Sequence, residues 1–232
     1  YPSSLISLCV KCKSMTMLYK MIQKTDINYQ HVVEIGVYKP ETANTLGFIK
    51  EGTFCTLFEA DPDTAKEIDK MFCKKYNVKI HSVALSSFKG TIKLYNAGAS
   101  SFCETIDHSP AIAHDGKSKE NLSHKEVRSE VFSTFDKGDI DILSIDIEGG
   151  EWDVINDMVS RPKVICIETQ SRDYINPKIK ELTQWLEDAS YEIWFVDDTD
   201  TIFVKKGLVK YSLMLKIKRL LHSKRFFNGK LL

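Results

Sequence analysis

The sequence has no net charge, no long hydrophobic run and no apolar leader. Its 232 residues carry 32 basic and 32 acidic side chains, which argues against binding through a positive surface that neutralises a nucleic-acid backbone. No run approaches the roughly 18 apolar residues of a membrane-spanning helix, and the start, YPSSLISLCVKCKS, is too polar for a signal peptide. We therefore expect a cytoplasmic location. Because the chain opens on Tyr1 rather than Met, we hypothesise that it belongs to a longer multidomain polypeptide or is a processed product.

Disulfides are not expected, although six cysteines are present. Cys55 and Cys166 lie inside apolar runs, where a free thiol behaves as a small hydrophobic side chain. Cys9 and Cys12 have the spacing of a zinc pair, but the sequence has no second pair. We interpret them as an incidental pair and leave the metal content of the protein open.

The remaining composition is that of an ordinary globular protein, with 43% hydrophobic and 28% charged residues. Apolar β-branched runs alternate with helical stretches, which predicts an α/β fold: a doubly wound, mostly parallel sheet with helices on both faces. The predicted strands are 31–36, 53–60, 78–85, 140–147 and 163–170, and the helices are 41–50, 62–76, 151–160 and 177–189. Two further runs, 191–198 and 199–206, flank an Asp-rich turn and predict an antiparallel C-terminal hairpin.

Three segments organise the chain. We expect an N-terminal helical flank over 1–30, a domain over 31–206 with an insertion at 90–138, and a basic helical tail over 207–232. The insertion begins with a hairpin-like stretch, GTIKLYN, followed by a long polar loop. The tail carries basic and no acidic residues; docking on its own domain is favoured, and peripheral membrane contact is the alternative.

The first predicted strand ends in Glu34 and Gly36, just before a helix. In an open parallel sheet this edge is where ligands bind. A dinucleotide fold needs GxGxxG here, whereas this turn has one glycine and a proline, so a nicotinamide-dependent oxidoreductase is disfavoured. The carboxylate of Glu34 would repel phosphate but suits ammonium and sulfonium charges, such as those of S-adenosylmethionine.

The other strand ends are also acidic or small. Glu59, in LFEADP, is placed to accept hydrogen bonds from both hydroxyls of a ribose. The third strand ends in HSVALS, whose small side chains leave room for adenine. In DILSIDIEGGEWDVI, Asp146 and Glu148 share a strand face and Glu151 begins a helix. Each acid alone could be a helix cap, but the joint pattern favours a ligand site.

These strand ends resemble the FkbM family of S-adenosylmethionine-dependent methyltransferases, which have the class I, seven-stranded, Rossmann-like fold. The resemblance runs from about His31 to Lys206 and rests on LFEADP, on VALSSFKGTIKLYN followed by SSF, and on IDIEGGEW followed by IETQ. Val37 to Pro40 replace the family's usual glycine-ending turn, and Ser144 stands where a lysine is common.

The resemblance implies a small-molecule O-methyltransferase whose acceptor is a sugar or glycan hydroxyl, for example of a deoxyhexose such as rhamnose or fucose. It implies the following cofactor-binding residues: Glu34, Gly36 and Tyr38 at the methionine end, Glu59 at the ribose, Ala60, Asp61, Ser82 and Val83 at the adenine, and Asp146 at the amino-acid or methyl end.

Methyl transfer to a sugar hydroxyl needs an aligned oxygen and a means of removing its proton. Glu148 is the first candidate base and Asp146 the second, and His108 and His114 in the insertion are alternatives. Asp146 and Glu168, at neighbouring strand ends, could instead hold Mg²⁺ or Mn²⁺; we rank this divalent cation below the base.

The rival hypothesis is a catalytically silent binding or scaffold domain of the same fold, which would dock on a membrane or partner through its basic ends. The acids at the strand ends favour the enzyme. Nucleic-acid methylation is disfavoured because the sequence lacks the Asn/Asp-Pro-Pro-aromatic tetrad that holds a flipped base.

Overall fold

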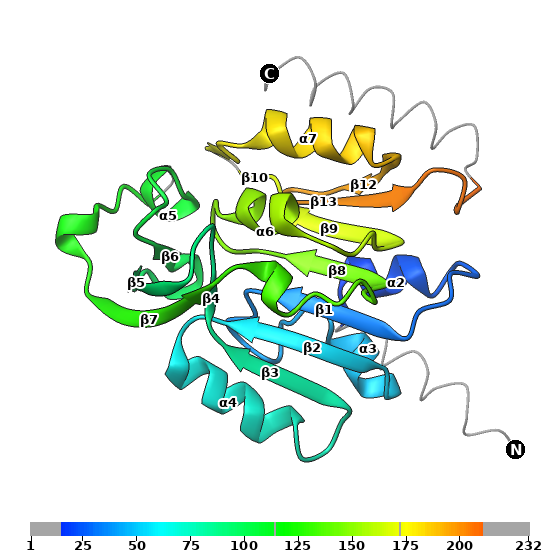
Figure 1. Cartoon of the computed structure of the whole chain (residues 1–232), viewed down its shortest axis with the longest axis horizontal. Helices are drawn as coiled ribbons and strands as arrows, with labels where there is room; N and C mark the ends of the chain where they lie inside the picture. The colour runs from blue at the N-terminus through cyan, green and yellow to red at the C-terminus, as the bar shows by residue number, and fades with distance from the viewer. Residues whose placement is uncertain (1–14, 114, 172, 211–232) are drawn as a thin grey trace, which may run out of the picture.

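The computed structural model describes residues 15–113, 115–171 and 173–210 (Figure 1). Cys9, Cys12 and His114 lie outside the described residues, as do residues 1–14 of the N-terminal flank and the tail from residue 211. Within the described part of the chain, no helix is long and apolar enough to cross a membrane.

A seven-stranded sheet forms the centre of the molecule (Figure 1). Its strands are β1 (His31–Ile35), β2 (Phe54–Glu59), β3 (Val78–Ser82), β8 (Ile142–Ile145), β9 (Val164–Glu168), β12 (Tyr191–Val196) and β13 (Asp200–Lys205). They lie in the order β12-β13-β9-β8-β1-β2-β3, with β9, β8, β1, β2 and β3 parallel. β13 is antiparallel to both β9 and β12. The predicted sheet with its antiparallel C-terminal hairpin is confirmed.

The order in which the chain adds strands to the sheet reverses at β1 and β8, although these two strands are parallel. From β1 the chain proceeds outward to β2 and β3, and it later returns to β8 and β9 on the other side of β1. The carboxyl ends of the two central strands stay joined, because the amide of Asp146 donates to the carbonyl of Ile35 at 2.9 Å. Such a switch point leaves a crevice above the strand ends where ligands bind.

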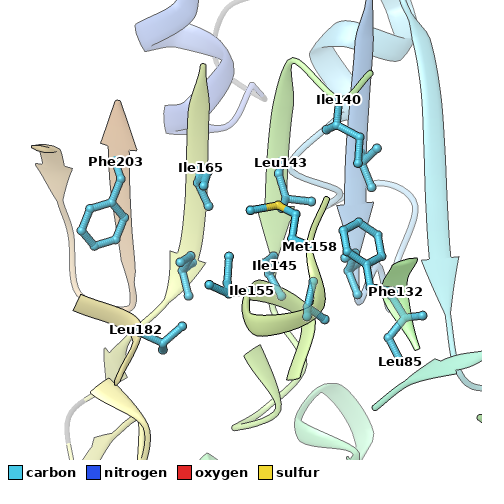
Figure 2. Packing of buried hydrophobic residues seen from close by; sticks show 14 of the residues in the cluster. Leu85, Phe132, Ile140, Leu143, Ile145, Ile155, Met158, Ile165, Leu182 and Phe203 are labelled. Atoms are coloured by element: carbon cyan, nitrogen blue, oxygen red, sulfur yellow. The ribbon is translucent and has the colours of Figure 1, made fainter. Parts of the chain in front are cut away.

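Helices cover both faces of the sheet. They are α2 (Met17–Ile22), α3 (Leu46–Glu51), α4 (Pro62–Phe72), α6 (Glu151–Asp157) and α7 (Ile179–Asp188), with the 3₁₀ turn η4 (Phe132–Thr134). The helix α5 (Pro110–Ala113) and the 3₁₀ turns η2 (Gly98–Ser100) and η3 (Lys119–Asn121) lie in the insertion. Successive strand residues point to opposite faces, so Leu143 and Ile165 pack with α6 and α7, as Figure 2 shows. Ile142 and Val164 instead pack with α2, α3 and α4.

The cysteines of the described residues fit these cores. Cys55 and Cys166 are buried, and Cys73 and Cys103 are partly exposed; all four thiols are free. Burial raises the pKa of the Cys73 thiol to about 11 and that of the Cys103 thiol to about 12, so these side chains stay uncharged and unreactive.

Helix α3 begins later than the predicted residue 41. The segment before Leu46 forms turns instead, because the buried carboxylate of Glu34 accepts hydrogen bonds from the amides of Asn44 at 2.7 Å and Thr45 at 2.9 Å. A tertiary contact from β1 therefore fixes a non-helical segment whose residue types alone allow a helix.

The insertion and the short strand before it form a second sheet. Its strands are β4 (Ala84–Leu85), β5 (Gly90–Tyr95), β6 (Phe102–Cys103) and β7 (His124–Glu130), in the order β4-β7-β5-β6. The expected hairpin is present, because β5 pairs antiparallel with β6. The expected long loop is wrong, because it contains β7, which pairs with β5 from Gly90 opposite Ser129 to Tyr95 opposite His124. The predicted strand 78–85 is therefore divided between β3 and β4. A short hairpin of β10 (Gln170–Ser171) and β11 (Tyr174–Ile175) follows β9.

Candidate functional site

A cavity of about 510 Å³ lies over the carboxyl ends of β1, β2 and β8. It brings together the predicted cofactor-binding residues except Ser82, and with them the first two candidate bases: Glu34, Gly36, Tyr38, Glu59, Ala60, Asp61, Val83, Asp146 and Glu148. Ser82 ends β3, is exposed and does not line this cavity. Strand ends that are distant in the sequence thus meet at one concave surface.

The turn after β1 is shaped by Gly36 and Tyr38. Gly36 has φ +83°, and a Cβ at this position would lie 1.8 Å from the backbone oxygen of Asp146, so the close approach of β1 to β8 requires glycine. Tyr38 also has a positive φ, +51°, which is unusual for a bulky residue. Such strain concentrates at functional sites.

Glu59 links the ends of β1 and β2. One carboxylate oxygen accepts from the amide of Asp61 at 2.9 Å, and the other accepts from the amides of Tyr38 at 3.0 Å and Val37 at 3.3 Å. Burial raises the pKa of Glu59, and these three amides oppose that rise. The carboxylate is therefore fixed at the cavity wall, where it can accept further hydrogen bonds from a ligand.

Asp61 caps helix α4 and binds a lysine of the second sheet. Its side chain accepts from the amides of Asp63 at 2.8 Å and Thr64 at 3.2 Å, and Lys125 Nζ lies 2.7 Å from Asp61 and 2.8 Å from Asp63. Although burial acts to raise it, Lys125 and the capping amides hold the pKa of Asp61 below its ordinary value. Lys125 closes the cavity beside α4, and no sequence pattern indicated it.

Glu34 supports the site from below. Besides the two amides that shape the turn before α3, its carboxylate accepts the hydroxyl of Thr45. The side chain is 3% exposed, and burial raises its pKa to about 7 despite these hydrogen bonds. Both oxygens are engaged by protein donors, so Glu34 acts on a ligand through the turn that it holds.

The second sheet supplies a wall that residue-by-residue sequence reasoning missed. The lining from this insertion comprises Leu94, Asn96, Gly98, Ala99, Ser101, Phe102, Cys103, Thr105, Ile106 and Lys125. The SSF motif at residues 100–102 was the available signal, because it falls within this wall. Burial raises the pKa of Glu148, and the hydroxyl of Ser100, in this motif, acts to lower it.

Three carboxyl groups meet at the end of β8. One oxygen atom each of Asp146, Glu148 and Glu168 lies within 4.8 Å of the other two. Burial raises the pKa of each group, and the charges of the neighbouring carboxylates raise it further. The structure therefore groups the predicted base residues with the predicted cation ligands.

The loop that carries Glu148 is held by Glu151. This buried side chain accepts from the amides of Ile147 at 3.0 Å and Gly149 at 3.2 Å, and from Asn176 Nδ2 at 2.5 Å. Glu148 itself has φ +61°. Glu151, which the sequence suggested only as a helix-start acid, thus fixes the backbone on which Glu148 is presented.

A second cavity of about 310 Å³ adjoins the first. The two share Thr105, Ile106, Gly150 and Asp153 as lining residues. The second is also lined by Ser87, Asp107, His108, Gly149, Trp152, Pro177 and Lys178. His108 stacks on Tyr174 with ring centroids 5.5 Å apart, so the structure places this histidine in the neighbouring cavity.

A family model matches most of this chain, and solved structures resemble it at low sequence identity. The model of the methyltransferase FkbM domain matches residues 34–193, and no curated protein matches the chain. A TehB-like S-adenosylmethionine-dependent methyltransferase from Corynebacterium glutamicum is 10% identical, with 86% of this chain and 93% of that chain covered and a TM-score of 0.44. TrmK from M. capricolum, solved with S-adenosylhomocysteine, is 11% identical, with 88% and 75% covered and a TM-score of 0.43.

Proposed function

Because this chain belongs to the FkbM methyltransferase family, we propose that it methylates a hydroxyl oxygen of a sugar or glycan. The fold is that of class I methyltransferases and the methyl donor is S-adenosylmethionine. The acceptor class and the roles of individual residues are our proposal. The observation that carries it is the single cavity in which the acidic ends of β1, β2 and β8 meet.

The cavity fits the methyl donor in size and in chemistry. Its volume of about 510 Å³ lies within the range of about 300–1,000 Å³ typical of small-molecule sites. Glu59 would accept the ribose hydroxyls, and Ala60 and Val83 would contact the adenine. The turn at Gly36 and Tyr38 would hold the methionine part, with Glu34 as a positioning residue beneath it.

The second cavity supports a sugar acceptor. A pyranose has an apolar C–H face that packs on an aromatic ring and hydroxyl groups that donate to carboxylates. Trp152 and His108 supply aromatic surface, and Asp107 and Asp153 supply carboxylates. Since Asp153 lines both cavities, an acceptor bound here would approach the methyl end of the donor.

The mechanism relies mainly on positioning. S-adenosylmethionine supplies an electrophilic methyl group. The strand ends and the insertion wall hold the acceptor oxygen in line with it and exclude water, and such alignment is worth about 7–11 kcal/mol. Glu148 accepts the hydroxyl proton, a contribution of about 10²–10⁴ in rate, and Asp146 lies beside the methyl end. Glu151 holds the loop of Glu148 for this step.

Calorimetry with S-adenosylmethionine tests the cofactor assignment. The wild type should bind, and Glu59→Gln should bind about 10- to 100-fold more weakly because a charge-assisted hydrogen bond is worth about 1.5–3 kcal/mol. The matched control is Glu67→Gln, an exposed acid on the following helix. No heat from the folded wild type at millimolar cofactor would refute the assignment.

A glycan panel with methyl-labelled donor tests the acceptor class. Label should appear on a sugar hydroxyl, and Trp152→Ala should raise the KM for that acceptor while leaving donor affinity unchanged. Label transferred only to non-carbohydrate acceptors would overturn the sugar proposal and leave the methyltransferase assignment standing.

A further inference from the structure

The acids at the ends of β8 and β9 converge more closely than donor binding requires. Asp146 follows β8, Glu168 ends β9, and Glu148 lies in the loop after β8, with one oxygen atom of each within 4.8 Å of the others. Glu148 is 9% exposed and Glu168 is 7% exposed. Asp146 and Glu148 line the main cavity, so the group lies at its edge.

Each of these three carboxyl groups has one buried oxygen without a hydrogen-bond partner. Asp146 Oδ1, Glu148 Oε2 and Glu168 Oε2 are buried without a hydrogen bond. In the part of the chain that the structure describes, no ion pair involves any of the three. Burying carboxylates without compensation is costly, so such groups are normally paired or bind a metal ion.

The surroundings hold the three side chains in place. β8 and β9 are hydrogen-bonded neighbours, which fixes the spacing of Asp146 and Glu168. Glu151 and Asn176 fix the loop of Glu148, whose positive φ is maintained by these contacts. Outer contacts of this kind orient the ligands of metal sites.

We propose that Asp146, Glu148 and Glu168 form a site for one divalent cation of the Mg²⁺ or Mn²⁺ class. Carboxylate oxygens are the ligands that these hard cations take from proteins, and the three unpartnered oxygens provide them from one side. The remaining positions, toward the cavity, are left to water and to the acceptor. This role toward the acceptor rests on the proposed function; cation binding itself does not.

The site gives the transfer a defined proton path. The acceptor hydroxyl, held beside the cation, loses its proton to the oxygen of Glu148 that does not bind the metal. The resulting oxygen forms a bond to the methyl carbon as the bond from that carbon to sulfur breaks, and neutral S-adenosylhomocysteine leaves. The positive charge stabilises the developing negative charge on the acceptor oxygen.

Manganese binding tests the proposal without acceptor or donor. The chelator-treated full chain is titrated with Mn²⁺, and free Mn²⁺ is measured by electron paramagnetic resonance. We expect one Mn²⁺ per chain in the wild type, at least about tenfold weaker binding in Glu168→Gln and Asp146→Asn, and unchanged binding in the exposed control Glu187→Gln. Mn²⁺ should also raise the melting temperature of the wild type but not that of Glu168→Gln.

Two results would overturn the site: no stoichiometric Mn²⁺ binding by folded wild type at millimolar concentration, or equal affinity in Glu168→Gln. Donor calorimetry on the same samples separates the hypotheses. If the wild type binds the donor but not Mn²⁺, the cation site is refuted and the proposed function stands. If the wild type binds Mn²⁺ but not the donor, the proposed function is refuted and the cation site stands.

Discussion

Two acidic residues at neighbouring strand ends have different roles although the sequence presents them alike. Glu59 keeps its carboxylate at the cavity wall by accepting three amides. Glu34, one strand away, is fully engaged with Asn44 and Thr45. Strand position predicted that both lie at the ligand edge. Which one faces the ligand depends on the path of the following turn, which the residue types do not determine.

Glu34 should make the stability of the protein depend on pH. Its carboxyl group loses a proton near 4.5 in the unfolded chain and near 7 in the folded one. Between these values the folded state binds more protons, so stability falls as pH rises and is level above about 7. Across this pH range, the raised pKa of Glu34 lowers the free energy of unfolding by on the order of 3 kcal/mol. In urea unfolding, the free energy of unfolding should fall less between pH 5 and pH 8 for Glu34→Gln than for the wild type.

The exposed variant Glu67→Gln is the control for this measurement and should retain the wild-type fall. An equally steep fall in Glu34→Gln would contradict the raised pKa. The absolute stability of Glu34→Gln at either pH is less informative, because glutamine also changes the hydrogen bonds to the turn before α3.

At the level of elements, the contact between β1 and β8 depends on Gly36. In Gly36→Ala, the new methyl group would collide with the backbone oxygen of Asp146, and the alanine would have to adopt a positive φ. We expect a loss of unfolding free energy of about 4 kcal/mol, within the range of severe substitutions. Gly52→Ala is the matched control, since Gly52 has φ +93° but nothing within 4 Å, and it should cost about 1–2 kcal/mol. Equal losses in chemical denaturation would show that the close approach is unimportant.

Sequence periodicity predicted the elements of the main sheet better than those of the insertion. Buried runs such as 140–147 and 163–170 identify their strands locally, and their acidic ends predicted residues that lie together in the candidate site. β5 instead pairs with β7, and Tyr95 lies opposite His124, so no local pattern reports that partner. The division of 78–85 between two sheets and the late start of α3 likewise follow from contacts distant in the sequence.

At the level of the whole molecule, the second sheet closes the main cavity and should respond to the donor. Lys125 bridges it to Asp61 and Asp63, and Phe102 and Cys103 line the cavity. In hydrogen exchange, S-adenosylmethionine should slow the amides of β6 and of residues 96–101 severalfold, because a ligand that binds the folded wall stabilises it against local unfolding. Helix α7, remote from this wall, serves as the internal control. Unchanged exchange in the wall at saturating donor would contradict its role.

The chain passes between the two sheets twice, from β7 to β8 and from β3 to β4, and the second of these connections is a single residue, Val83, since β3 ends at Ser82 and β4 begins at Ala84. Strand side chains alternate, so adding or removing one residue here would exchange the inward and outward sides of β4. The stretch between β6 and β7 carries no such constraint, because both of its ends lie within the same sheet. A change in the length of that stretch should therefore be tolerated more readily than a change at Val83, which would alter how the second sheet meets the main cavity.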